Sequence, residues 1–236
     1  MSRINFIPAY VLHRRDYQNS SLLVELFTPN EGRLPAIAKG AKSGRSSKAI
    51  LLQPFLPLRI SLSGRGEIKS LIEVEQDGQP FKLLGERIYC GFYLNELIVR
   101  LIERDDPFPS LFVHYCQSLA QLASTEPVDR ILRQFELRLL TELGYGLLLD
   151  HTADSGEPIK QELVYDYFIE AGPVLSSSGG SGMRIHGSTL IGLHNGTSLA
   201  KQSAKEAKQL MRFVLSHYLG DKPLKSRELF TGPTGW

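Results

Sequence analysis

The sequence has 236 residues, of which 42% are hydrophobic, and its formal net charge is only +2. This length suits one large domain or two modest ones, and the apolar content excludes an intrinsically disordered chain. No apolar run approaches the roughly 18 residues of a membrane span, and Pro8 interrupts the short apolar stretch after Arg3, which argues against a signal peptide. We therefore expect a cytoplasmic protein.

Positive charge is concentrated at the start of the chain. Residues 1–72 contain eleven Lys and Arg against four acids, so they carry +7 and the remainder carries −5. Such asymmetry indicates a polyanion-binding part joined to a part with another task. The alternative is a soluble domain whose surface is merely basic.

The first 76 residues show the alternation and turn chemistry of short strands. The expected strands are Ala9–Arg14, Ser21–Thr28, Arg33–Lys39, Phe55–Leu62 and Glu67–Glu75. Gly40–Ala49 lacks apolar periodicity and is expected to be a polar loop. Because a short sheet must close or cover its edges, this pattern predicts a small five-stranded β-barrel.

After Asp77–Pro80 the apolar period becomes helical, so we predict one domain at residues 1–79 and a mainly helical one at 80–236. The expected helices are Leu83–Arg104, Pro109–Ala123, Pro127–Leu143 and Ser203–Leu219. Thr125 is expected to cap the third helix and Gly144 to end it in a left-handed conformation. The fold class is therefore α+β.

An insertion interrupts the helical domain at about residues 150–187. Within it, Leu163–Ile169 and Val174–Ser176 are expected to pair as a β-hairpin. The Ser/Gly run Ser176–Gly182 is expected to be mobile.

The sequence contains no phosphate-binding loop, dinucleotide fingerprint or catalytic motif. Two weak alternatives remain: a general base at His151 beside Asp150, and a nuclease cation site formed by acids before Pro107. Those acids, which can equally serve the next helix N-terminus, are Glu103, Asp105 and Asp106. Cys90 and Cys116 fit buried positions rather than a zinc cluster, so we expect no catalytic residue, cofactor or metal.

Basic residues offer stronger candidates for a site. Lys and Arg supply fixed positive charge, and nearby glycines let a backbone approach a phosphate. The candidate DNA contacts of the barrel are Arg33, Lys39, Lys42, Arg45, Lys48, Arg65 and Lys69. A second stripe on the last helix comprises Lys205, Lys208 and Arg212. The aromatic residues Tyr10, Tyr17, Phe27 and Phe55 are candidates either for base stacking or for the barrel core.

Six short strings spread in order along the chain carry a resemblance. They are Ala38–Ala41, Gln53–Phe55, Gly64–Glu67, Gly91–Leu97, Leu143–Gly146 and Pro223–Leu229. Together they resemble the bacterial DNA repair protein RecO family. The resemblance implies an OB-fold N-terminal domain and a recombination mediator that binds single- and double-stranded DNA and anneals strands without catalytic turnover. It also implies partners: single-strand-binding protein (SSB), RecR and, functionally, RecA.

This sequence departs from those members of the family that carry a four-cysteine zinc cluster, because residues 150–187 contain no cysteine. We expect a metal-free version packed around Tyr165, Tyr167 and Phe168.

The resemblance further implies that an acidic, Phe-ended SSB tail docks on the helical domain, which requires an apolar pocket beside a cation. The candidates are Arg130, Arg133, Phe135 and Leu139, with Arg133 favoured for the tail carboxylate. The alternative is that these arginines are solvated. Near the C-terminus, Lys225 and Arg227 either extend the DNA path, or Arg227 pairs with Glu228 and ties down the chain end.

Two other functions stay open. A general RNA-binding OB-fold protein would share the basic barrel but gives no reason for the helical domain. A nuclease would require metal and the acids before Pro107.

Overall fold

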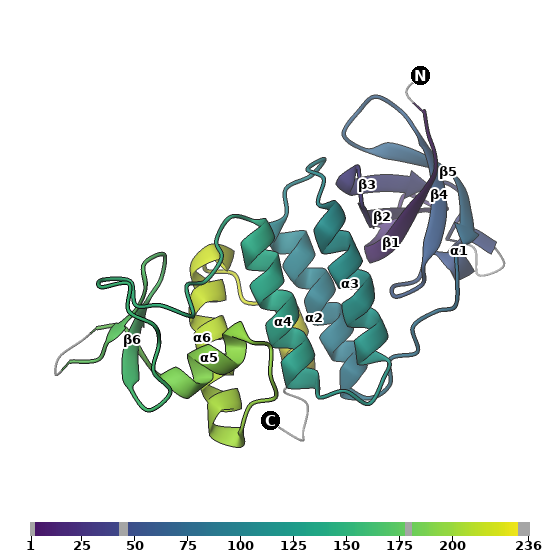
Figure 1. Cartoon of the computed structure of the whole chain (residues 1–236). Coiled ribbons are helices and arrows are strands. Elements are labelled where there is room, and N and C mark those ends of the chain that lie inside the picture. Colours follow the sequence, from purple (N-terminus) through teal and green to yellow (C-terminus); the bar gives the residue numbers. More distant parts are fainter. Residues whose placement is uncertain (1–2, 43–46, 178–180, 231–236) are drawn as a thin grey trace. The chain divides into compact units, whose positions relative to one another are not determined.

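The computed structural model describes residues 3–42, 47–177 and 181–230 (Figure 1). It falls into two compact units, one containing the chain up to Ser124 together with the part from Leu224 onward, and the other Thr125–Pro223. The first unit runs past the predicted domain boundary at residues 79 and 80, because two helices pack on the barrel; that boundary stays a prediction.

The first unit is built on a closed barrel with strand order β1-β2-β3-β5-β4, in which only β3 and β5 are parallel among the barrel's pairings. Its strands are β1 (Arg3–Tyr17), β2 (Ser21–Thr28), β3 (Gly32–Ala38), β4 (Leu58–Ser63) and β5 (Lys69–Gln76). A short helix, α1 (Ser47–Leu51), connects β3 to β4. The predicted α+β class and five-stranded barrel are confirmed; α1 was not predicted.

Strand alternation explains the barrel interior. Leu58, Ile60 and Leu62 of β4 are at most 1% exposed and belong to one core with apolar residues of the other strands. The β2–β3 turn also makes a close approach, because a Cβ on Gly32 would lie 2.0 Å from the carbonyl oxygen of Asp106. Gly32 has φ +63°, so both its backbone and its surroundings require glycine.

Two helices, α2 (Glu86–Leu101) and α3 (Pro109–Leu122), pack on the barrel within the first unit. Asn95 of α2, 2% exposed, donates a 2.9 Å hydrogen bond to the Leu12 carbonyl of β1 and accepts a 2.6 Å bond from the Tyr115 hydroxyl of α3. Around this link, Tyr10 and Phe27 of the barrel contact Tyr115 edge-on. One buried amide therefore joins a strand and two helices.

The segment η1 (Lys225–Phe230) returns to α2 in the same unit. The Glu96 carboxylate accepts hydrogen bonds from the backbone N–H groups of Lys225 and Ser226 at 2.9 and 2.8 Å, and from the Ser226 hydroxyl at 2.6 Å. These bonds hold Lys225 and Ser226 against α2 through Glu96, which is a different tie from the predicted pairing of Arg227 with Glu228. That pairing and the alternative of a DNA path stay predictions.

The second unit combines helices with a small antiparallel sheet of order β7-β6-β8. Its elements are α4 (Val128–Glu142), β6 (Val164–Phe168), β7 (Gly172–Leu175), β8 (Met183–His186), α5 (Gly187–His194) and α6 (Lys201–Leu219). The predicted hairpin is confirmed as β6–β7, whereas β8 and α5 were missed. Tyr165 and Tyr167 are buried in this sheet. Residues 178–180 of the run expected to be mobile lie outside the described residues.

The ends of α4 test two predicted caps. Gly144 has φ +85°, and the N–H of Tyr145 donates to the Leu140 carbonyl at 2.8 Å, so the left-handed end is confirmed. The prediction for Thr125 is wrong: the N-cap residue is Pro127, with no side-chain hydrogen bond at the cap. Proline has a fixed φ but no side-chain acceptor, so it cannot cap the helix with its side chain. Asp129 in the first turn adds negative charge at this end of α4.

Glu206 of α6 organises the junction of β8, α5 and α6. Its carboxylate, 8% exposed, accepts hydrogen bonds from the Thr189 hydroxyl at 2.7 Å, from the Gln202 amide at 3.1 Å and from the His186 backbone at 3.3 Å. Burial by itself raises the pKa of Glu206, but these donors and the His186 ring outweigh it and lower the pKa below 4.5.

Asn95→Ala should destabilise the protein by about 3 kcal/mol, because it leaves both the Leu12 carbonyl and the Tyr115 hydroxyl buried without a partner. Tyr115→Phe, which orphans one acceptor only, should cost about 1–2 kcal/mol. Urea unfolding measures both values. The exposed Asn195→Ala is the matched control and should shift stability by under about 0.5 kcal/mol. Equal stabilities of wild type and Asn95→Ala would contradict this role.

Glu206→Gln should lower the unfolding free energy by about 1–3 kcal/mol at neutral pH, since an amide cannot accept from all of these donors. Because the folded-state pKa is depressed, the stabilisation is present above the ordinary value of 4.5 and is lost as pH falls through the lower folded pKa. The difference between wild type and variant should therefore shrink in chemical denaturation below about pH 4.5. A stability difference that stays constant below pH 4.5 would contradict this role of the ionised Glu206 carboxylate. The control is Glu162→Gln, at an exposed position.

Candidate nucleic-acid interface

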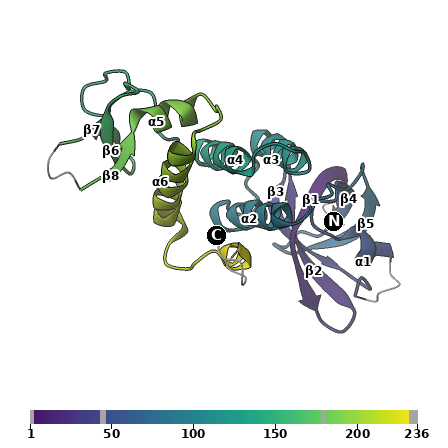
Figure 2. The same ribbon diagram turned by 90° about the horizontal axis from the view of Figure 1, so that it is seen from below.

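The strand meander gathers basic residues at one end of the barrel. Tyr17 pairs with Ser21 at the β1–β2 turn, Leu22 pairs with Ala38 at the end of β3, and the N–H of Lys42 donates to the Ser20 carbonyl at 3.0 Å. The helix α1 lies against β5 beside this region (Figure 2). We call this the basic end, and it comprises Arg14, Arg15, Lys39, Lys42 and Lys48.

The lysines of the basic end differ in their contacts. Lys39 is exposed and has no ion-pair partner among the described residues. Lys42 forms a 2.8 Å ion pair with Asp16, although its side chain stays 40% exposed. Lys48 donates to the Ile72 carbonyl at 3.1 Å. Arg45 lies outside the described residues.

A hollow of about 410 Å³ opens at the basic end and is lined by Arg14, Arg15 and Lys42 with Asp16 as its acid. Arg14 donates to the carbonyls of Ala49 and Leu52 at 3.2 and 3.0 Å, which holds it beside the end of α1. Sequence reasoning missed both arginines as site residues. Only the pairing of β1, β2 and β3 places them beside the loop that follows β3.

The second basic turn lies between β4 and β5. Arg65 is exposed, and Lys69 donates to the Gly66 carbonyl at 2.9 Å. Lys69 also pairs with Ala36 across the parallel β3–β5 contact, three residues before Lys39. The register thus brings Lys69 near the strand that leads into the basic end.

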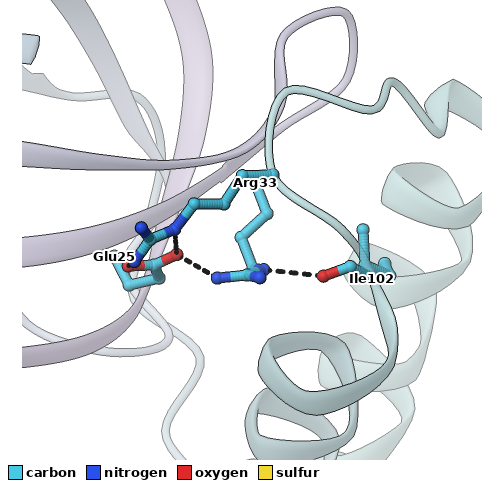
Figure 3. A network of polar contacts seen from close by, with 4 residues as sticks. Glu25, Arg33 and Ile102 are labelled. Carbon is cyan, nitrogen blue, oxygen red and sulfur yellow. Dashed lines mark hydrogen bonds and ion pairs between the residues drawn. The ribbon is translucent and has the colours of Figure 1, made fainter. Parts of the chain in front are cut away.

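The side chain of Arg33 is engaged in contacts within the fold and is not free to bind a ligand (Figure 3). Its side chain, 13% exposed, donates to the Ile102 carbonyl at 3.0 Å and forms an ion pair with Glu25. Arg104 shares the same carboxylate at 3.4 Å. Because these acceptors engage its guanidinium, Arg33 holds β2 and β3 to the end of α2, and we remove it from the candidate DNA contacts.

Three of the four aromatic candidates belong to the core. Tyr10, Phe27 and Phe55 are 5%, 0% and 6% exposed, and they pack against aromatic rings of the same unit. Tyr17 is half-buried. Phe6 of β1, which is not one of the four candidates, is 47% exposed at a strand irregularity and has φ +50°.

The stripe on α6 is solvent-facing. Lys205, Lys208 and Arg212 are all exposed, whereas the opposite face of the helix buries Leu210 and Val214. This surface belongs to the second unit.

A small pocket of about 160 Å³ lies beside α4, in the second unit, and is lined by Arg130, Arg133 and Leu137 together with residues of the Leu193–Ala204 stretch. Arg133 is 8% exposed and donates to Glu136 at 2.6 Å. Its Nε and Nη1 have no hydrogen-bond partner within the described chain. Phe135 and Leu139 are buried in the core and do not line the pocket.

The acidic candidates are dispersed on the surface. Glu103, Asp105 and Asp106 are exposed, and the Asp105 N–H donates to the Arg33 carbonyl at 3.0 Å. Over residues 3–42, 47–177 and 181–230, no group of three or more His, Cys, Asp or Glu could hold a metal. In the same ranges, no helix is long and apolar enough to cross a membrane.

Comparison with known proteins matches both parts of the chain. Residues 1–77 match the family model described as Recombination protein O N terminal, and residues 85–228 match Recombination protein O C terminal.

Curated relatives extend the match to nearly full length. The DNA repair protein RecO of Methylococcus capsulatus is 48% identical over 229 residues, which is 97% of this chain and 94% of the relative. Those of Nitrosospira multiformis and Coxiella burnetii are 46% and 43% identical, over 94% and 96% of this chain and 93% and 98% of theirs.

Proposed function

Because the chain belongs to the RecO family of DNA repair and recombination proteins, we propose that it is a mediator without catalytic turnover. In this proposal it binds single- and double-stranded DNA, anneals complementary strands and, with RecR, helps load RecA on SSB-coated DNA in the cytoplasm. The observation that carries it is the basic end, where cations from β1 and the β3–α1 connection line a hollow on a closed barrel.

Annealing needs charge neutralisation more than chemistry. Two complementary strands repel through their phosphates, and a basic surface lowers that repulsion while released counterions add entropy. Lys39 is exposed, and the ion pair of Lys42 with Asp16 is solvent-accessible, so a phosphate can replace the carboxylate there. The basic end therefore suits reversible contacts to a DNA backbone.

The proposed DNA contacts extend beyond this hollow. From the sequence we retain Lys39, Lys42, Arg45, Lys48, Arg65, Lys69, Lys205, Lys208 and Arg212, and from the structure we add Arg14 and Arg15. Lys39 and Lys42 are the sharpest test, because both are exposed and neither contributes to the core.

The double variant Lys39→Ala, Lys42→Ala should weaken single-strand binding and flatten its log–log salt slope by about 1.4, since each lysine that neutralises a phosphate contributes about 0.7 to that slope. Fluorescence anisotropy of a labelled oligonucleotide, titrated at several salt concentrations, measures both. Annealing of complementary oligonucleotides should slow in parallel.

The matched control, Lys82→Ala with Lys160→Ala, removes two exposed lysines outside the basic end and should leave the slope near wild type. An unchanged salt slope in the Lys39→Ala, Lys42→Ala variant would exclude these two lysines as contacts to DNA phosphates. The annealing assay is also run with and without magnesium, because metal-dependent strand cleavage would show that the protein is a nuclease and not a mediator.

An RNA competitor that displaces DNA completely would favour the general RNA-binding alternative.

We also propose that the pocket beside α4 receives the C-terminal tail of SSB. A Phe-ended acidic tail presents an apolar ring next to carboxylates, and this pocket offers leucines beside two arginines. Arg133 supports the proposal most directly, because two nitrogens of its largely buried guanidinium, Nε and Nη1, have no hydrogen-bond partner in the described chain. Phe135 and Leu139 shape the helix behind the pocket, and Leu137, Leu193 and Leu199 replace them as lining. We assign no surface to RecR.

Arg133→Ala should weaken binding of an acidic peptide that ends in Phe by about tenfold or more, since charge-assisted bonds contribute about 1.5–3 kcal/mol. Isothermal titration with the full chain measures this. Removing Arg133 also strips Glu136 of its ion pair, so Arg130→Ala, at an exposed position, serves as a second variant and should weaken binding about threefold. Arg138→Ala on the same helix is the control; equal affinities in all three variants would place the tail elsewhere.

A further inference from the structure

A second cavity in the Thr125–Pro223 unit has aromatic walls. It has a volume of about 310 Å³ and lies where the segment after α4, the β6–β7 turn and the end of α6 meet. Its lining includes Tyr145, Tyr167, Glu170 and Tyr218. None of these residues has a part in the proposed DNA or tail contacts.

Tyr145 presents a rigid aromatic face at this cavity. The left-handed Gly144 and the Tyr145 N–H bond to Leu140 fix its backbone directly after α4. Its ring stacks on Tyr218 with centroids 4.3 Å apart and planes at 20°, yet Tyr145 remains 47% exposed. Part of the Tyr145 ring therefore stays accessible to a ligand at this cavity.

The cavity is electrostatically negative. Glu170 is its one acid among the described lining residues, and none of those residues is Lys or Arg. Burial raises the pKa of both Tyr167 and Tyr218, so their hydroxyls stay protonated and their rings contribute π faces. The adjacent His217 lies with its Nε2 3.6 Å from Glu170 Oε1, and this ring adds positive charge only when it is protonated.

Glu170 has a backbone conformation that is unfavourable for a residue with a side chain. Its φ of +65° lies in the left-handed region that favours glycine, and its side chain is 66% exposed. The β6–β7 turn thus holds a carboxylate at the cavity rim where glycine would be less strained.

We propose that this cavity binds the guanidinium group of an arginine presented by a partner protein. A planar guanidinium can stack on the open face of Tyr145 while two of its N–H groups donate to the Glu170 carboxylate. A nucleotide is disfavoured, because its phosphate would meet Glu170 with no lysine or arginine among the described lining residues to offset the repulsion. The inference goes beyond the proposed function and does not depend on it.

The test uses isotope-labelled full-length protein and three short probes: acetyl-Gly-Arg-Gly-amide, its lysine analogue and thymidine 5′-monophosphate. In NMR titrations the arginine peptide should saturate and shift the ring signals of Tyr145 and Tyr218, while the other two probes should bind at least about threefold more weakly. Glu170→Gln and Tyr145→Leu should each weaken the arginine peptide by about threefold or more.

The matched control is Glu162→Gln, which removes an exposed carboxylate outside the cavity and should leave peptide affinity unchanged. Glu170→Gln should also leave single-strand DNA affinity at the wild-type value, which separates this proposal from the DNA-binding one. Absence of saturation, equal binding of the lysine peptide, preferential binding of the nucleotide, or equal weakening by Glu162→Gln would each overturn it.

Discussion

The buried amide of Asn95 is the link on which the first unit depends. A polar side chain that is 2% exposed must satisfy its donor and acceptor inside the protein, and it does so with β1 and α3 at the same time. Leu12, its partner on β1, lies two residues before Arg14. The link that joins helices to the barrel therefore also holds the strand that carries arginines to the basic end.

The arginines of this chain show why charge alone does not identify a binding surface. Arg33 and Arg104 share the Glu25 carboxylate and close the barrel against the end of α2. Arg14 is anchored on two carbonyls but still lines an open hollow. An arginine can thus brace the fold or offer charge to a ligand. Arg33 and Arg14 each engage two acceptors, but one acceptor of Arg33 is a carboxylate that neutralises its charge, whereas both acceptors of Arg14 are uncharged carbonyls.

The second unit carries two cavities of opposite character. The pocket beside α4 contains a buried guanidinium and suits an anionic, apolar-ended segment. The cavity of Tyr145 and Tyr218 contains a carboxylate and aromatic faces and suits a cation. Because α4 contributes to the first and its glycine-ended C-terminus leads into the second, one helix borders both of the proposed recognition sites.

Local sequence determined much of the architecture. The Leu, Val and Phe content of Ser21–Thr28 predicted β2, the 3.6-residue period predicted four long helices, and Gly144 marked a left-handed helix end, because such signals reside in consecutive residues. The helices α1 and α5 were missed, since helices of five and eight residues depend on tertiary packing rather than on their own pattern. The four-residue strand β8 was missed as well. Only the tertiary structure decided that Tyr10 and Phe27 pack inside, that Arg33 is braced by Glu25, and that Arg14 and Arg15 stand beside Lys42. Burial and pairing depend on residues distant in sequence, and no local pattern encodes those.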